Sequence, residues 1–449
     1  MLRIRLIIKL RAFLNFKSYS EQLLQRLLKN QLFKDSFWSL AGNVIGRGLA
    51  LLAGILVARF LGKDVFGEYG IIRNTILTIG VFSTFGLGYT ATKYIADLKT
   101  SKPFLIRTFI SYAIQITLIF SGLMAVGLFI FAALISEELL GVAHLTLPLR
   151  LLSILIIFNA LTTTQVGILS GFGKFKAMAK INMSMGILTF IFSGILAYYF
   201  ELEGALLALL LVQVLNFLFN FFLVKKSVKS FPKSLSKDKK FRKGIIQFST
   251  PIALQEAVYS LTSWLGYLLL VNYASFGELG MYSAAMQWNA IVLFIPGILR
   301  NVILSHLSAT ASNDKRHGTI LKQIIVVNLG ATLVPFIGIL LFSSWISSFY
   351  GQTFQGLDDV LTLAVFSTIA ISVSNVFAQA YTSIGKNWQM LIFRMIRDIL
   401  ILGCFLILIN LISVRPALIM IYSQLFTNFL FLIIISINYK MIRKWEINY

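Results

Sequence analysis

Long apolar blocks alternate with short polar segments along most of the chain. A transmembrane helix needs about 20 consecutive, mostly apolar residues, and twelve blocks reach that length. We predict spans at Phe37–Leu61, Tyr69–Ala96, Leu105–Ile135, Leu147–Gly171, Ala177–Phe200, Ala205–Val224, Ile245–Tyr273, Met281–His306, Thr319–Trp345, Leu357–Ser383, Trp388–Ile409 and Val414–Tyr439. The pattern indicates an all-α polytopic membrane protein with twelve transmembrane helices.

The charges between these blocks change sign from one polar segment to the next. The basic segments hold Lys93, Lys99, Lys102 and Arg107; Lys174, Lys176 and Lys180; Lys225–Lys243; Lys315, Arg316 and Lys322; Lys386; and Lys440, Arg443 and Lys444. The segments between them hold Glu137 and Glu138, Glu201 and Glu203, Glu278, and Asp358 and Asp359. Because Lys and Arg near span ends stay in the cytoplasm, each change of sign marks a crossing. Both termini are therefore expected in the cytoplasm.

One long basic segment divides the twelve blocks into six and six. Residues 225–244 contain nine Lys and Arg residues together with Pro232, and we predict a cytoplasmic linker there. Six-helix bundles are expected at 37–224 and 245–440, and a cytoplasmic tail at 441–449. Residues 1–36 mix apolar residues with Arg and Lys and have no cleavage site of a signal peptide. We expect them to form a basic amphipathic segment on the inner leaflet.

Short motifs recur in the two halves at nearly the same distance. Phe66-Gly67-Glu68-Tyr69 corresponds to Leu279-Gly280-Met281-Tyr282 at an offset of 213 residues, and Gly171-Phe172-Gly173-Lys174 corresponds to Ser383-Ile384-Gly385-Lys386 at an offset of 212. With six spans in each repeat, both halves have the same orientation and are related by a pseudo-two-fold axis along the membrane normal. Such halves commonly rock around a central cavity, which is typical of transporters.

The composition agrees with a membrane protein and argues against other classes. Of the 449 residues, 57% are hydrophobic and 13% are charged, which is too little charge for the surface of a soluble domain. The formal net charge of +23 is explained by basic inner loops that meet anionic inner-leaflet lipids, so we expect no nucleic-acid partner. Three scattered His residues and the single Cys404 show no metal-ligand spacing, and no metal or cofactor is expected.

Several ionisable residues lie inside the predicted spans. Each costs roughly 2.5–3.5 kcal/mol on insertion scales and therefore needs a partner or a hydrated cavity. Asn43 and Arg47 lie on one face of the first span, and Arg47 is deep enough that we expect it in such a cavity. The seventh span carries Glu256 about halfway across. The eleventh carries Arg394, Arg397 and Asp398 on one side.

For some of these residues, a purely structural role remains open. Arg394 and Asp398 are spaced four residues apart and could simply neutralise each other. Arg300 near the inner end of the eighth span could extend to the interface, and Arg73 could meet lipid headgroups or acidic neighbours. Taken together, however, the deep cations outnumber the deep anions. Because guanidinium groups match phosphate and carboxylate oxygens, we expect an anionic cargo bound by Arg47, Asn43, Arg394, Arg397, Arg300 and Arg73.

Three stretches of the chain carry a family resemblance: Val57-Ala58-Arg59-Phe60-Leu61-Gly62-Lys63-Asp64-Val65-Phe66-Gly67-Glu68-Tyr69, Leu169-Ser170-Gly171-Phe172-Gly173-Lys174-Phe175 and Gly277-Glu278-Leu279-Gly280-Met281-Tyr282. They resemble the bacterial polysaccharide transporters, the oligosaccharide-lipid flippases of the multidrug/oligosaccharidyl-lipid/polysaccharide exporter superfamily.

The resemblance implies two bundles that work by alternating access on an isoprenoid-pyrophosphate-linked oligosaccharide in the cytoplasmic membrane. Many relatives carry an acidic residue near the position of Ser263 and Trp264, where this chain has none. H⁺ or Na⁺ coupling through Glu256 or Asp398 is therefore a hypothesis.

Other functions predict different features. A cation-coupled drug antiporter of the same superfamily would favour net acid in the cavity. A major-facilitator carrier would show a Gly-, Asp- and Arg-rich signature after the second span, where this chain has Ala96-Asp97-Leu98-Lys99. A membrane polymerase or acyltransferase acting on lipid-linked sugar would need a large external loop or an intramembrane His. We expect a transporter and not an enzyme, present as a monomer and associated at most with a polysaccharide polymerase.

Overall fold

The computed structural model describes residues 31–232, 239–310 and 314–447 of the chain. Most of the predicted N-terminal segment 1–36, the middle of the linker 225–244 and the last two residues of the tail 441–449 lie outside these ranges. The described residues form helices and contain no strand, as the sequence predicts. Their α-helices are α2 (Gln31–Thr84), α3 (Leu87–Ser101), α4 (Ile106–Ala133), α5 (Thr146–Leu152), α6 (Ile154–Gly171), α7 (Phe175–Val228), α8 (Lys239–Tyr273), α9 (Phe276–Val292), α10 (Phe294–Ala309), α11 (Asp314–Ser348), α12 (Leu357–Ser383), α13 (Asn387–Leu411) and α14 (Pro416–Ile447).

Two of these helices are interrupted and hold more than one crossing length. α2 changes direction at Gly62, which has φ 70°, a left-handed value that glycine adopts without the steric cost of a Cβ. α7 is interrupted at Phe200 and Glu201. The backbone therefore turns at two of the places where the hydrophobic pattern changes to polar residues. Below, the two parts of α2 are given as residues 31–61 and 63–84.

Seven described segments are long and apolar enough to cross a membrane, and the longest, Gly42–Ser101 and Phe175–Val228, have 60 and 54 residues. Since about 20 residues suffice for one crossing, these segments are each long enough to cross more than once. The protein is therefore a multi-pass membrane protein.

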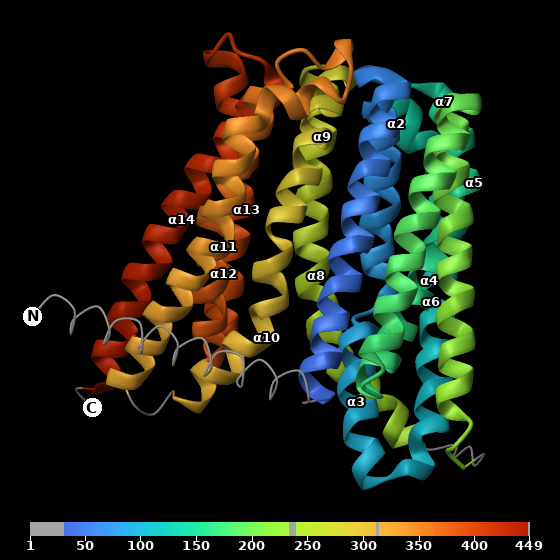
Figure 1. Cartoon of the computed structure of the whole chain (residues 1–449), viewed down its shortest axis with the longest axis vertical. Coiled ribbons are helices and arrows are strands. Elements are labelled where there is room, and N and C mark those ends of the chain that lie inside the picture. Colours follow the sequence, from blue (N-terminus) through green and yellow to red (C-terminus); the bar gives the residue numbers. More distant parts are fainter. Residues whose placement is uncertain (1–30, 233–238, 311–313, 448–449) are drawn as a thin grey trace, which may run out of the picture.

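The helices gather into two groups that touch more closely at one end than at the other. In Figure 1, α2–α7 stand on one side and α9–α14 on the other, and the groups meet at the end where α2 turns back. Toward the opposite end, α10 and α2 diverge. α8 contacts α2 and α3 of the first group as well as α9, α13 and α14 of the second, so it links the two groups. Following the sequence, we name the end where α2 turns the outer end.

Candidate functional site

Two helices, residues 63–84 of α2 and the whole of α9, meet at the outer end in a seam of small residues. A Cβ atom added to Gly67 would overlap with the carbonyl oxygen of Phe276, and one added to Gly280 would overlap with the carbonyl oxygen of Lys63. Only glycine lets the two backbones approach this closely. The seam therefore depends on Gly67 and Gly280.

The contacts across this seam are reciprocal. Lys63 and Phe276 are 213 positions apart, and so are Gly67 and Gly280, so the contact of Gly67 with Phe276 has its mirror in the contact of Gly280 with Lys63. A third pair with the same offset, Gly70 and Ser283, meets directly: a Cβ on Gly70 would lie 2.7 Å from the Ser283 hydroxyl oxygen. The repeated motif of the sequence therefore lies where the two halves touch each other.

Aromatic residues add to the closure of the outer end. The rings of Phe66 and Phe354 meet edge to face with centroids 6.1 Å apart, and both side chains are almost fully buried. In the second group, the Trp288 indole donates a hydrogen bond of 2.9 Å to the Tyr350 hydroxyl. The outer end is therefore closed by dry, tightly packed contacts.

Further inward, the two sides of the interface differ. On one side α8 remains attached to the first group, because the Trp264 indole donates to the Thr75 hydroxyl at 2.9 Å and the hydroxyls of Thr90 and Ser249 lie 2.8 Å apart. On the other side, the Arg47 guanidinium in residues 31–61 of α2 lies over the Phe294 ring of α10, and the Gln287 side chain of α9 lies against Gly54. Hydrogen bonds thus join α8 to the first group, whereas α10 and α2 diverge toward the inner end (Figure 1).

Arg47 lies on the side that separates. Its guanidinium carbon is 4.3 Å from the centre of the Phe294 ring of α10, a distance at which a cation is attracted to a ring face. The Arg47 side chain is exposed, as are its neighbours Val44 and Ile45. One turn away, the Asn43 side-chain oxygen accepts a 2.7 Å hydrogen bond from Asn182 of α7. Arg47 therefore reaches from one group toward the other across a sparsely covered surface.

Arg73 is a second exposed cation, on residues 63–84 of α2. Its charge acts on the hydroxyl of Tyr267 in α8, which places it near the junction of the two groups. Among the described residues, no carboxylate forms a salt bridge with Arg47 or Arg73. These two arginines leave net positive charge beside the interface.

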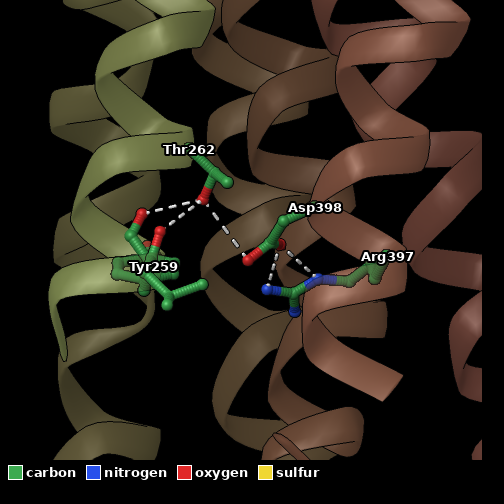
Figure 2. Close-up of polar contacts among 5 residues, drawn as sticks. Tyr259, Thr262, Arg397 and Asp398 are labelled. Atoms are coloured by element: carbon green, nitrogen blue, oxygen red, sulfur yellow. Dashed lines mark hydrogen bonds and ion pairs between the residues drawn. The ribbon is translucent and has the colours of Figure 1, made fainter. Parts of the chain in front are cut away.

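The charges of α13 are arranged differently, as Figure 2 shows. Nε and Nη2 of Arg397 lie 2.8 and 2.6 Å from Oδ1 of Asp398, and the Thr262 hydroxyl of α8 reaches Oδ2 at 3.5 Å. The side chains of the pair are only 13% and 9% exposed. Arg397 also lies 5.1 Å from the centre of the Phe431 ring. Asp398 is thus neutralised by its sequence neighbour Arg397, a pairing that the sequence analysis did not consider.

The remaining predicted site residues lie on α8, α10 and α13. Glu256 of α8 and Arg394 of α13 are both partly exposed, and each interacts with another group. α8 and α13 contact each other, so the structure brings their polar residues to one helix interface. Arg300 belongs to α10, but its side chain lies outside the described part of the chain.

Sequence reasoning did not single out Asn74 and Gln287. Both are partly exposed, and each has one amide atom that is covered and without a hydrogen-bond partner, Nδ2 in Asn74 and Oε1 in Gln287. The offset of 213 residues relates these positions as well, and that was the available signal. It could not be used before the seam was known.

An apolar groove of about 570 Å³ lies elsewhere, between α12, α13 and α14. Phe366, Cys404 and Phe429 are among its lining residues, and none of the lining residues is charged. The groove therefore offers nothing to an anionic headgroup, and it lies apart from the seam and from Arg47.

Comparison with known proteins gives a family match and similar folds. A family model described as polysaccharide biosynthesis protein matches residues 32–305. A lipid III flippase of Escherichia coli (strain K12) is 30% identical over 189 residues, which make up 41% of this chain and 44% of that protein.

Two solved structures extend the similarity to most of the chain. The inward-facing conformation of a multidrug resistance MATE family transporter of the MOP superfamily has a TM-score of 0.74 at 16% identity, covering 89% of this chain and 96% of that one. The lipid II flippase MurJ in an inward closed conformation has a TM-score of 0.70 at 15% identity, covering 90% of this chain and 87% of that one. At these identities the two structures share their fold with this chain.

Proposed function

This chain belongs to the polysaccharide biosynthesis protein family, whose model matches more than half of its residues, and on that premise we propose that it is a flippase for lipid-linked oligosaccharide. The family resemblance seen in the sequence is confirmed. The proposed cargo is an isoprenoid-pyrophosphate-linked repeat unit, carried from the inner to the outer leaflet of the cytoplasmic membrane. The protein forms and breaks no bond of the cargo, so it is a transporter and not an enzyme.

The proposal includes twelve spans in two six-helix bundles, 37–224 and 245–440, joined by the cytoplasmic linker 225–244. The reciprocal seam supports it, because contacts of the type i to j and j to i arise between elements related by a two-fold axis. The basic segment 1–36 and the tail 441–449 are then cytoplasmic, next to anionic lipid. We propose a monomer, which a polysaccharide polymerase could join.

The observation that carries the proposal is the difference between the two ends of the interface between the helix groups. The outer end is closed by Gly67, Gly280 and aromatic contacts, whereas Arg47 and Arg73 of α2 are exposed further inward. Such an arrangement admits a headgroup from the cytoplasmic side and blocks its exit until the seam opens. Alternating access requires this property.

The exposed charge favours an anionic headgroup. Arg47 and Arg73 lack a salt-bridge partner among the described residues. One guanidinium group can bind phosphate through two parallel hydrogen bonds. With the cytoplasm negative, outward movement of a negative charge is favoured by about 2.3 kcal/mol per charge per 100 mV. The membrane potential therefore assists the proposed direction of transport.

The roles of the other charged residues extend this proposal. Arg394, Arg397 and Arg300 would bind cargo once the second group rearranges, with Asn43 supporting Arg47 from the same helix face. Glu256 or Asp398 would bind H⁺ or Na⁺ as a coupling ion. The Arg397–Asp398 pair must separate before Asp398 can do so, which makes Glu256 the simpler candidate.

A cation-coupled drug antiporter of the same superfamily is the nearest alternative. This alternative agrees with the fold that the chain shares with the MATE transporter, but cationic drugs require acidic groups at the interface. The cations of α2 argue against it. A polymerase or acyltransferase acting on lipid-linked sugar is a weaker alternative, which a flipping assay without bond formation would separate.

The test is Arg47→Ala in protein reconstituted into vesicles with a lipid-linked oligosaccharide. A charge-assisted hydrogen bond contributes about 1.5–3 kcal/mol, so flipping should fall about 10- to 100-fold, enough to abolish export in cells. Arg59→Ala is the matched control, because Arg59 is an exposed arginine of the same helix near the outer end. Wild-type flipping by a correctly inserted Arg47→Ala variant would contradict the proposal.

A further inference from the structure

We propose that Asn74 of α2 and Gln287 of α9 form a hydrogen-bonding subsite for the uncharged saccharide part of the cargo. The inference rests on the proposed flippase function and deepens it, because it separates the residues that bind sugar from those that bind the charged group.

The seam follows one face of each helix and ends at the two amides. Its positions are 63, 67, 70 and 74 on α2 and 276, 280, 283 and 287 on α9, spaced by four, three and four residues in both helices. This spacing keeps one face of each helix turned to the other. The outer three positions of each helix make the close contacts described above. Asn74 and Gln287 are the next, inner pair.

The two amides do not complete the seam. Opposed Asn and Gln side chains in a closed seam would be expected to hydrogen-bond each other, yet among the described residues neither forms a hydrogen bond. Nδ2 of Asn74 and Oε1 of Gln287 are covered without a partner, and the Gln287 side chain lies against Gly54 of α2. The two amides therefore do not pair with each other, although Gln287 packs closely against the first part of α2.

Buried polar atoms without partners are rare and costly. More than 90% of buried polar groups in proteins are hydrogen-bonded, and leaving one unmet costs roughly 1–3 kcal/mol. Two such atoms at equivalent positions of one interface indicate groups that are kept for a partner outside this part of the chain. Each side chain is also partly exposed, so a partner can reach part of each amide.

The chemistry of the two amides suits a saccharide better than a phosphate. An amide offers both a donor and an acceptor, and a sugar hydroxyl can use both, whereas an ionised phosphate oxygen only accepts. Arg73 is the sequence neighbour of Asn74, and Arg47 lies on the other part of the same helix, stacked on Phe294. A cargo in the interface would therefore place its charged group at the arginines and its sugar against the inner end of the seam.

The experiment compares two probes in vesicles that contain the full chain. One probe is an isoprenyl pyrophosphate that carries a disaccharide, and the other is the same isoprenyl pyrophosphate without sugar. Flipping is measured as accessibility of the headgroup to an impermeant reagent, periodate for the sugar and a phosphatase for the bare pyrophosphate. The variant is Asn74→Leu combined with Gln287→Met, which preserves side-chain volume and removes the hydrogen-bonding groups.

We expect the double variant to bind and flip the disaccharide probe about tenfold less well, since two neutral hydrogen bonds of ordinary strength are lost. Flipping of the sugar-free probe should not change. Asn410→Leu combined with Gln115→Met is the matched control, because both amides are exposed and far from the seam in sequence. The control should flip both probes as the wild type does.

Two results would overturn the inference. Equal losses with both probes would assign the amides to the opening of the seam and not to sugar binding. Unchanged flipping of both probes would remove any role of the amides in transport. A wild-type protein that flips neither probe would instead refute the proposed function, so the two failures can be distinguished.

Discussion

Arg47 and Arg73 of α2 and Arg397 of α13 all place a charge inside an apolar helix, but they do so in opposite ways. Arg397 is mostly buried and shares its charge with Asp398, and it stacks on Phe431. Arg47 and Arg73 are exposed and have no carboxylate partner among the described residues. A buried charge needs a counter-charge to persist in a membrane, whereas an exposed one keeps its charge for a ligand. In this conformation Arg397 and Asp398 neutralise each other, whereas Arg47 and Arg73 form no salt bridge among the described residues.

The largest expected effect is on the stability of the second group. Arg397→Ala leaves Asp398 buried without its counter-charge, which typically costs 3–5 kcal/mol. We therefore expect a free energy of unfolding lower by about that amount, measured as a shift of the thermal unfolding midpoint in detergent. Arg397→Met combined with Asp398→Leu removes both charges and should recover most of the loss. Normal stability of the single variant would mean that Arg397 resembles Arg47 more than the structure indicates.

A smaller effect is expected on the closure of the outer end by the seam between α2 and α9. Gly280→Val forces a side chain against the Lys63 carbonyl, and overpacking of this kind typically costs 1–3 kcal/mol. Closure of the outer end should weaken. In a Cys404→Ser background, a Ser283→Cys reporter should then react faster with an impermeant maleimide added outside.

The control for this variant is Gly338→Val in α11, because a Cβ at Gly338 meets no neighbouring atom within 4 Å. It should leave the labelling rate unchanged. If the Ser283→Cys reporter is labelled no faster with Gly280→Val than without it, the seam is not what closes the outer end.

The smallest effect is expected on the coupling of transport to an H⁺ or Na⁺ gradient. Glu256→Gln combined with Asp398→Asn removes the two acids that could bind an ion. We expect flipping in vesicles to lose its dependence on an imposed H⁺ or Na⁺ gradient, with a change of a few fold in rate. If flipping and its gradient dependence are unchanged, these acids serve structure alone, and the ion-coupling hypothesis is abandoned.

The alternation of apolar blocks and polar segments was sufficient to predict a helical, multi-pass membrane protein. Residues such as Gly62, Phe200 and Glu201 lie where apolar blocks end, and the backbone turns there. A membrane leaves the chain little choice, because every backbone polar group in the hydrocarbon region must be satisfied within the structure, which only helices and closed barrels achieve. Local composition therefore determines where the helices form.

The candidate site was predicted only in part, because the role of a deep charge depends on its neighbours in space. Arg47 and Arg397 look alike in sequence, since both lie inside apolar blocks. The spacing of four left open a pair of Arg394 and Asp398, and the structure shows a pair of Arg397 and Asp398. Pairing of this kind depends on rotamers and on the facing helix, which supplies Thr262.

Sequence alone determined that this chain is a multi-pass helical membrane protein with a motif repeated at an offset of 213 residues. Tertiary structure alone decided that the repeated glycines contact the facing helix, that Asp398 is already neutralised, and that Asn74 and Gln287 each keep an amide atom without a hydrogen-bond partner. The physical reason is the range of the forces involved. Transfer from water to lipid acts on each segment separately, whereas close approach and charge pairing arise only between segments that folding has brought together.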